Sequence, residues 1–123
     1  MKAAFVVWQE RIAPVFDTAR QAVIVTMDEG GRAMTRMEPL TGPTPGHDLM
    51  RLRDMGVDTL VCGAMSRPMQ QAAAACGLRV IPFVAGETQA MISAWQQGRL
   101  EHGRFAMPGC RGRRQRRKRR RRD

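Results

Sequence analysis

The sequence of 123 residues is poor in aromatic residues and in the motifs that carry most enzyme chemistry. Aromatic residues make up 5% of the chain and tyrosine is absent, so ten methionines and many alanines must fill much of the core. No HExxH, Ser–His–Asp or paired-carboxylate pattern is present, and neither GxGxxG nor GxxxxGK(S/T) occurs. These absences argue against a metalloprotease, a two-metal nuclease and a nucleotide-binding enzyme, and we expect the protein not to be an enzyme.

Cysteines and long apolar runs are also scarce. The three cysteines, Cys62, Cys76 and Cys110, form no CxxC pair and no disulfide framework, which favours a reducing compartment. The apolar run near the N-terminus stops at Trp8 and is followed by charged residues, so it is too short for a signal peptide. Nothing approaches the roughly 20 apolar residues of a membrane-spanning helix. We therefore expect a cytoplasmic protein without membrane contact.

Positive charge is abundant but lies almost entirely at one end. The formal net charge is +10, and residues 111–122 contain ten of the 21 basic residues, which leaves residues 1–110 almost neutral. A segment of this composition has nothing to bury and repels itself, so it predicts disorder. It could contact nucleic-acid phosphates without base specificity, dock to an acidic partner, attract an anionic ligand or remain solvated. We predict one domain over 1–104 and a flexible exit with an Arg-rich tail over 105–123.

The distribution of apolar and turn residues predicts one α/β domain. Strands are expected at 3–8, 20–28, 32–37, 58–62 and 78–84. Helices are expected to begin near Pro45, Ser66 and Gly86 and to end at Gly56, Gly77 and Gly98. The strand–helix–strand order of the second half implies parallel pairing, whereas a hairpin in the first half supplies antiparallel pairing. A mixed sheet with helices packed against it follows.

The most informative segment runs from the end of a strand at Cys62, through a glycine turn, into a helix. Ligands of open α/β sheets bind at such strand ends, and a helix N-terminus attracts anions. Gly63, Ser66 and Arg67 are therefore candidate cofactor-binding residues. Cys62 is a candidate soft-metal ligand or nucleophile, because the positive field there should lower the pKa of its thiol. The alternative is that Cys62 is a small buried hydrophobic residue and Ser66 only a helix cap.

Two other residues are candidate metal ligands. His47 lies near the start of the first helix and could face the same edge of the sheet, although a solvated histidine is the more common case there. Cys110 precedes the arginines, and an accessible thiol beside cations should be reactive and able to bind metal; the alternative is a surface thiol without a role. We interpret Cys76 and the scattered methionines as packing residues.

Five ordered stretches resemble the dinitrogenase iron–molybdenum cofactor biosynthesis family, of the NifX and NifB C-terminal type. They are Arg11 to Ala19, Val57 to Pro68, Gly77 to Gly86, Ala94 to Leu100 and Met107 to Cys110. The resemblance implies a three-layer α/β/α fold of ribonuclease H-like topology, with a mixed, mostly parallel five-stranded sheet and no nuclease activity. It also implies that the protein binds an iron–sulfur or iron–molybdenum cluster precursor as a carrier, with metallocofactor assembly proteins as partners.

The chemistry of the candidate residues is compatible with this resemblance. Metal–sulfur clusters are anionic and soft, so a thiolate, an imidazole, a helix N-terminus and an arginine suit them. A carrier must release its cargo, and Cys62 with His47 or Cys110 would be a ligand set small enough for reversible binding. Two alternatives stay open: a nucleic-acid-associated α/β module acting through the Arg-rich tail, and a thiol-dependent enzyme using Cys62, which lacks a nearby base in the sequence.

Overall fold

The central element of the computed structural model, which describes residues 1–100, is a strand buried on both faces. The six strands are β1 (Lys2–Trp8), β2 (Arg11–Ile12), β3 (Gln21–Met27), β4 (Ala33–Pro39), β5 (Thr59–Val61) and β6 (Arg79–Ile81). The sheet has the order β4–β3–β1–β5–β6, and β2 pairs with the end of β1. β1 therefore occupies the middle of the sheet, as its unbroken apolar sequence predicts.

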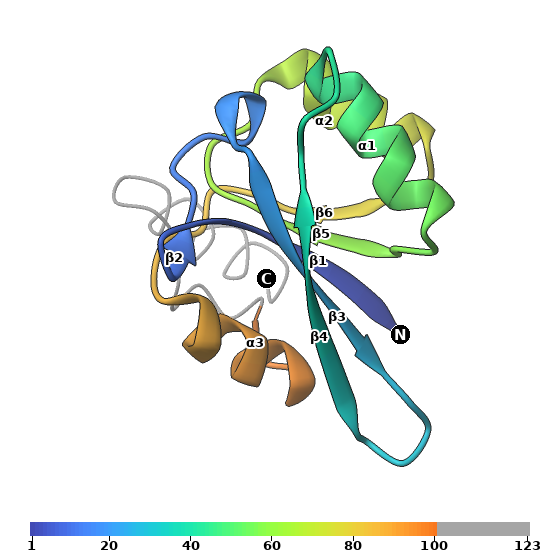
Figure 1. Ribbon diagram of the computed structural model, residues 1–123, viewed down its shortest axis with the longest axis vertical. Helices are drawn as coiled ribbons and strands as arrows, with labels where there is room; N and C mark the ends of the chain where they lie inside the picture. Colours follow the sequence, from blue (N-terminus) through green and yellow to red (C-terminus); the bar gives the residue numbers. More distant parts are fainter. Residues whose placement is uncertain (101–123) are drawn as a thin grey trace, which may run out of the picture.

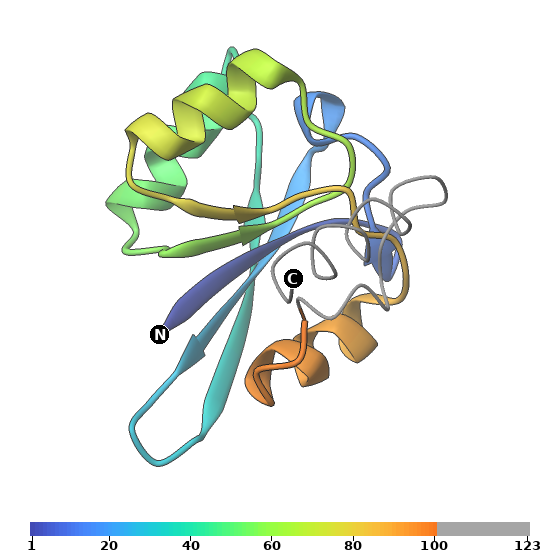
Figure 2. The same ribbon diagram turned by 180° about the vertical axis from the view of Figure 1, so that it is seen from behind.

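Helices cover both faces of this sheet (Figures 1 and 2). The helical elements are η1 (Phe16–Thr18), a single 3₁₀ turn, and the α-helices α1 (Pro45–Asp54), α2 (Arg67–Ala75) and α3 (Thr88–Gln96). α1 and α2 pack on one face and α3 packs on the other, which confirms the predicted three-layer α/β/α fold. None of the helices within residues 1–100 is long and apolar enough to cross a bilayer.

Two hydrophobic cores lie on opposite faces of the sheet, and β1 contributes to both. Ala4 and Val6 point towards α1 and α2, whereas Ala3, Phe5 and Val7 point towards α3. This alternation is the period of two that a strand imposes on its side chains. On the α3 side, the rings of Phe5 and Trp95 meet edge to face, with their centroids 6.0 Å apart. Two of the few aromatic residues of the chain are therefore used where β1 contacts α3.

The sheet differs from the expected one in its strand count and in its balance of directions. It has six strands rather than five, and only β1–β5 and β5–β6 are parallel, so the expectation of a mostly parallel sheet is wrong. The additional strand forms because Gln9 and Glu10 both adopt positive φ, 54° and 48°, in a two-residue turn that folds β2 back on β1. Asn-Gly is the usual signal for such a turn, so the sequence here predicts only a loop.

The predicted helix boundaries agree with the structure. Thr44 caps α1, since its Oγ1 accepts a hydrogen bond from the His47 backbone N–H at 3.2 Å, and Pro45 is the first helical residue. Gly56, Gly77 and Gly98 lie just after the three α-helices and adopt positive φ values of 88°, 83° and 71°. Glycine adopts this left-handed conformation without strain, which is why it ends a helix so effectively.

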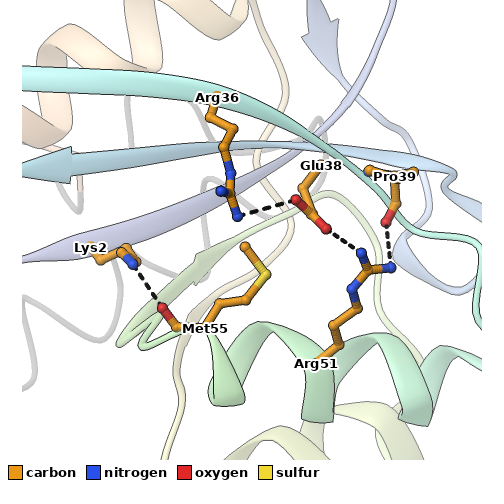
Figure 3. A network of polar contacts seen from close by, with 6 residues as sticks. All are labelled: Lys2, Arg36, Glu38, Pro39, Arg51 and Met55. Atoms are coloured by element: carbon orange, nitrogen blue, oxygen red, sulfur yellow. Dashed lines mark hydrogen bonds and ion pairs between the residues drawn. The ribbon is translucent and has the colours of Figure 1, made fainter.

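A buried carboxylate ties the edge strand β4 to α1 (Figure 3). Glu38 is only 8% exposed and forms ion pairs with Arg51 of α1 and with Arg36 of its own strand. Arg51 also donates to the Pro39 carbonyl oxygen at 3.5 Å. A carboxylate that is removed from water needs such partners, because its desolvation is otherwise uncompensated. Lys2 adds a second tie to the helix layer through the Met55 carbonyl oxygen, at 2.7 Å.

We expect Arg51→Ala to lower the free energy of unfolding by about 1–2 kcal/mol, because Glu38 then keeps only one of its two cationic partners. Urea denaturation monitored by circular dichroism measures this change. Arg53→Ala is the matched control, since Arg53 pairs with Asp54 on the exposed side of the same helix, and it should cost less than about 0.5 kcal/mol. Equal losses in the two variants would contradict a structural role for the buried pair.

Candidate functional site

Three loops meet at the edge of the sheet where the parallel strands β1, β5 and β6 end, which we call the carboxyl edge. They span residues 9–20, 62–66 and 82–87. Backbone hydrogen bonds join them: Ala64 N donates to Pro14 O (2.7 Å), Phe16 N to Ala64 O (2.8 Å), Phe83 N to Gly63 O (2.9 Å) and Ile12 N to Gly86 O (3.0 Å). Open α/β sheets bind their ligands at this edge, so the position agrees with the site expected from sequence.

All three α-helices begin at the carboxyl edge. α2 and α3 follow β5 and β6 directly, and α1 starts here because its opposite end leads into β5. The partial positive charges of three helix N-termini therefore gather along one edge. At the start of α3, the hydroxyl of Thr88 is buried and has no hydrogen-bond partner in the described part of the chain.

Gly63 is the residue that lets the first loop approach β5. A Cβ atom at this position would lie far inside van der Waals contact with the carbonyl oxygens of Ala13 and Pro14. Because these are backbone atoms, a side chain here would displace the whole loop rather than rotate a neighbour away. The structure therefore gives Gly63 a packing role, and ligand contact by its backbone stays a prediction.

The N-terminus of α2 is already occupied by a carboxylate of the protein itself. Asp17 accepts a hydrogen bond from the Ser66 backbone N–H at 3.2 Å and from the Ser66 hydroxyl at 2.7 Å. Ser66 stands at the N-cap position, but its side chain makes no cap bond to the helix, and Asp17 supplies the negative charge instead. The helix end proposed for an anionic ligand is thus neutralised from within, and Arg67, exposed at the first residue of α2, remains beside it.

Cys62 lies in the hydrophobic core rather than on the surface of the site. Its side chain is fully buried among the residues packed under α1 and α2. Burial, together with the smaller effect of the negative charge of Asp17, raises the pKa of the Cys62 thiol to about 12. The expected lowering of this pKa is therefore wrong, because desolvation outweighs the field of the helix. The structure agrees with the packing alternative, and a ligand role for Cys62 requires the thiol to leave the core.

The other candidate ligands are not gathered into one metal centre. His47 is exposed at the start of α1, where its Nδ1 lies 2.9 Å from Thr44 Oγ1. Within residues 1–100, no group of three or more histidine, cysteine, aspartate or glutamate side chains is placed to hold a metal ion. Cys110 and the segment 105–123 lie outside the described residues, so the accessible thiol, the tail and its nucleic-acid contacts stay predictions.

Two hollows at the carboxyl edge share a wall that contains Arg20. The first is polar, has a volume of about 310 Å³ and is lined by residues of η1 and the start of α1, including Asp17 and Thr44. The second is a mostly apolar groove of about 710 Å³, in which Trp8 and Val15 are 60% and 40% exposed. Asp17 and Thr44, which line the polar hollow, bind two of the predicted site residues: Asp17 accepts from Ser66, and Thr44 is hydrogen-bonded to His47. Ser66 and His47 therefore lie next to the polar hollow.

Asp17, Arg20 and Trp8 are the residues of this edge that sequence reasoning missed as site residues. Trp8 is the last residue of the central strand, and a large aromatic residue at a strand end is a signal that could have been used. Asp17 lies within η1 and Arg20 follows it, in a segment predicted only as a loop. Their roles depend on contacts with residues far along the chain, for which the local sequence holds no signal.

The fold and its edge define a small three-layer α/β/α protein whose helices all begin where ligands of such sheets bind. The chain belongs to the dinitrogenase iron–molybdenum cofactor family, whose family model matches residues 1–98. The resemblance found in the sequence is therefore confirmed over nearly the whole described chain. A search of the curated proteins found no match.

Solved structures share the fold at low sequence identity. The crystal structure of PH0822 has a TM-score of 0.72 and 18% identity, and covers 80% of this chain and 90% of that chain. The crystal structure of MJ0327 from Methanocaldococcus jannaschii has a TM-score of 0.64 and 14% identity, with coverage of 80% and 90%. The NMR structure of TM1290 from Thermotoga has a TM-score of 0.57 and 23% identity, with coverage of 80% and 89%. At these identities the likeness concerns the fold alone.

We expect Gly63→Ala to lower the free energy of unfolding by at least about 2 kcal/mol, because the added Cβ pushes two backbone carbonyls away from β5. Gly30→Ala is the control: its Cβ would meet only the Asp28 side chain, at an ordinary 3.5 Å, so the change should stay within about 0.5 kcal/mol. Urea unfolding curves compare the two variants. If the Gly63→Ala protein were as stable as the Gly30→Ala protein, the close packing of the Ala13 and Pro14 carbonyls against Gly63 would be refuted.

Burial of Cys62 also predicts a dependence of stability on pH. The unfolded thiol ionises near its ordinary pKa of 9.0, whereas the folded thiol keeps its proton up to about 12. Above about pH 9 the unfolded chain therefore releases a proton that the folded chain retains, and stability falls by up to about 1.4 kcal/mol per pH unit. Below pH 9 this contribution is constant. Unfolding free energies of the wild type and Cys62→Ala, measured from neutral to alkaline pH, should diverge in slope only above pH 9; parallel curves would contradict the buried thiol.

Proposed function

We propose that the protein is a non-enzymatic carrier for an anionic iron–sulfur or iron–molybdenum cluster precursor, which it binds reversibly at the carboxyl edge. The observation that carries the proposal is membership of the iron–molybdenum cofactor family over residues 1–98. Proteins that assemble the metallocofactor would be its donors and acceptors. In this role the cluster is cargo and not a resident cofactor.

The charge at the carboxyl edge supports an anionic cargo. Three helices direct their N-termini towards it, and Arg20 stands in the wall between the two hollows. Since Asp17 already neutralises the start of α2, the cargo would lie beside that helix end, against Arg20 and Arg67, rather than on it.

The protein ligands that we propose are His47 and Cys110. His47 is exposed, and a hydrogen bond at its Nδ1 leaves Nε2 as the atom that would coordinate a metal. Cys110 supplies the soft thiolate that iron–sulfur clusters prefer. The Cys62 thiol is the weaker part of the predicted ligand set, because its burial and raised pKa oppose thiolate formation. Two ligands bind less tightly than a cage of four cysteines, which suits a carrier that must release its cargo.

Anaerobic reconstitution of the full chain with ferrous iron and sulfide tests the proposal. After removal of unbound reagents, we expect the wild type to retain iron and acid-labile sulfide with broad visible absorption. His47→Ala and Cys110→Ser should each retain several-fold less iron, since each removes one of two ligands. Cys76→Ser is the matched thiol control, because Cys76 lies at the opposite end of α2, and it should retain the wild-type amount.

The outcomes separate the parts of the proposal. A wild type that retains no iron would overturn the carrier function. Equal loss in Cys76→Ser and Cys110→Ser would show unspecific binding to thiols, which also contradicts it. Loss of the cluster in Cys62→Ala alone, with the fold intact by circular dichroism, would contradict His47 and Cys110 as ligands and assign the site to the core thiol.

A further inference from the structure

Strand β4 forms one edge of the sheet along its whole length. It pairs with β3 over seven consecutive residue pairs, from Gln21–Pro39 to Met27–Ala33, without a bulge. Within residues 1–100 no further strand pairs with its other side, and in both views the β3–β4 hairpin extends beyond the three α-helices (Figures 1 and 2). The opposite edge strand, β6, has only three residues. β4 is thus the long edge of the described sheet.

The hydrogen bonds of the hairpin show which backbone groups of β4 point outward. Leu40 N donates to Arg20 O, and Arg32 O accepts from Asp28 N, so the even-numbered residues bond to β3. Strand geometry alternates, and the backbone groups of Ala33, Thr35, Met37 and Pro39 therefore face away from the sheet. Pro39 has no N–H, and its carbonyl oxygen accepts from Arg51. The edge open to pairing consequently consists of Ala33, Thr35 and Met37.

This edge has few of the devices that usually keep edge strands apart. Between Ala33 and Met37 there is no lysine, no proline and no bulge, Arg36 is the single charged residue, and no described helix lies over the outer side of the strand. Instead, Met34 and Met37 are 76% and 55% exposed. A long, regular strand edge of this kind is a template for another strand.

We propose that β4 pairs in antiparallel fashion with β4 of a second copy of this chain, with the two-fold axis at Thr35. This register sets Thr35 opposite Thr35 and each Ala33 opposite Met37 of the second copy, so every outward N–H and carbonyl of the three residues finds a partner. Pro39, which cannot donate, falls outside the new ladder. Two such sheets then form one continuous sheet.

The pattern of charge and proline along β4 suits a second copy of the strand in this register. With the axis at Thr35, the exposed Met34 stands opposite Arg36 of the second copy, so no two like charges of the strand face each other. An axis at Arg36 would set the two Arg36 residues directly opposite each other, which is destabilising. An axis at Met37 would place the donorless Pro39 opposite Thr35 and lose hydrogen bonds. The strand is therefore self-complementary in one register.

Sedimentation equilibrium of the full chain over a range of concentrations tests the dimer. We expect a reversible monomer–dimer equilibrium in the wild type. Thr35→Lys sets two like charges opposite each other and should raise the dissociation constant about fivefold or more. Met50→Lys, which adds the same charge on an exposed residue of α1, should leave it unchanged. A wild type that stays monomeric throughout, or variants with equal effects, would overturn the proposal.

Disulfide trapping tests the register independently, in a chain with Cys76 and Cys110 replaced by serine. Facing Thr35 residues would have Cα atoms about 5.5 Å apart, within disulfide range, so Thr35→Cys should give a covalent dimer on mild oxidation. In the same register the two Met37 residues lie about 14 Å apart along the strands, and Met37→Cys should give no covalent dimer. The reverse result would refute this register, and failure of both variants to cross-link would refute strand pairing.

Discussion

Backbone packed directly against backbone at Gly63 is the contact on which the carboxyl edge depends. The missing Cβ lets the carbonyls of Ala13 and Pro14 approach the end of β5, and this approach places Ala64 where it exchanges hydrogen bonds with the first loop. The same glycine accepts a hydrogen bond from Phe83, so it joins all three loops. The positions of η1, Asp17 and Arg20 therefore depend on the absence of a side chain at Gly63.

The sequence predicts the elements of this fold well because they depend on local chemistry. The apolar run of β1, the Thr44–Pro45 start of α1 and the glycines after each helix all act within a few residues of where they stand. The contacts that the sequence could not predict join residues that lie far apart along the chain. Asp17 supplies the negative charge at the start of α2 by binding the N-cap residue Ser66, which lies 49 residues later, and no local pattern marks that pairing.

The error over Cys62 has the same origin. A cysteine at a strand end before a helix fits both a reactive thiol and a core residue, and the choice depends on what covers it. Here α1 and α2 cover it, so the cost of desolvating a thiolate exceeds the attraction of the helix dipole. Position relative to the helix was predictable from sequence, whereas burial was not. The predicted segment does lie at the carboxyl edge, but ligand binding there and the roles of its residues stay predictions.

The sharing of β1 between the two cores has a consequence for cooperativity. β3 and β5 also place side chains in both cores, but β1 contributes five buried residues to them and, within the described sheet, is the strand that pairs with three others, β2, β3 and β5. If α3 alone detaches from the sheet, the β1 side chains on that face become exposed, while those on the α1 and α2 face stay buried. The amides in the middle of β1 open to hydrogen exchange only when both layers separate, so this strand reports the global unfolding of the domain.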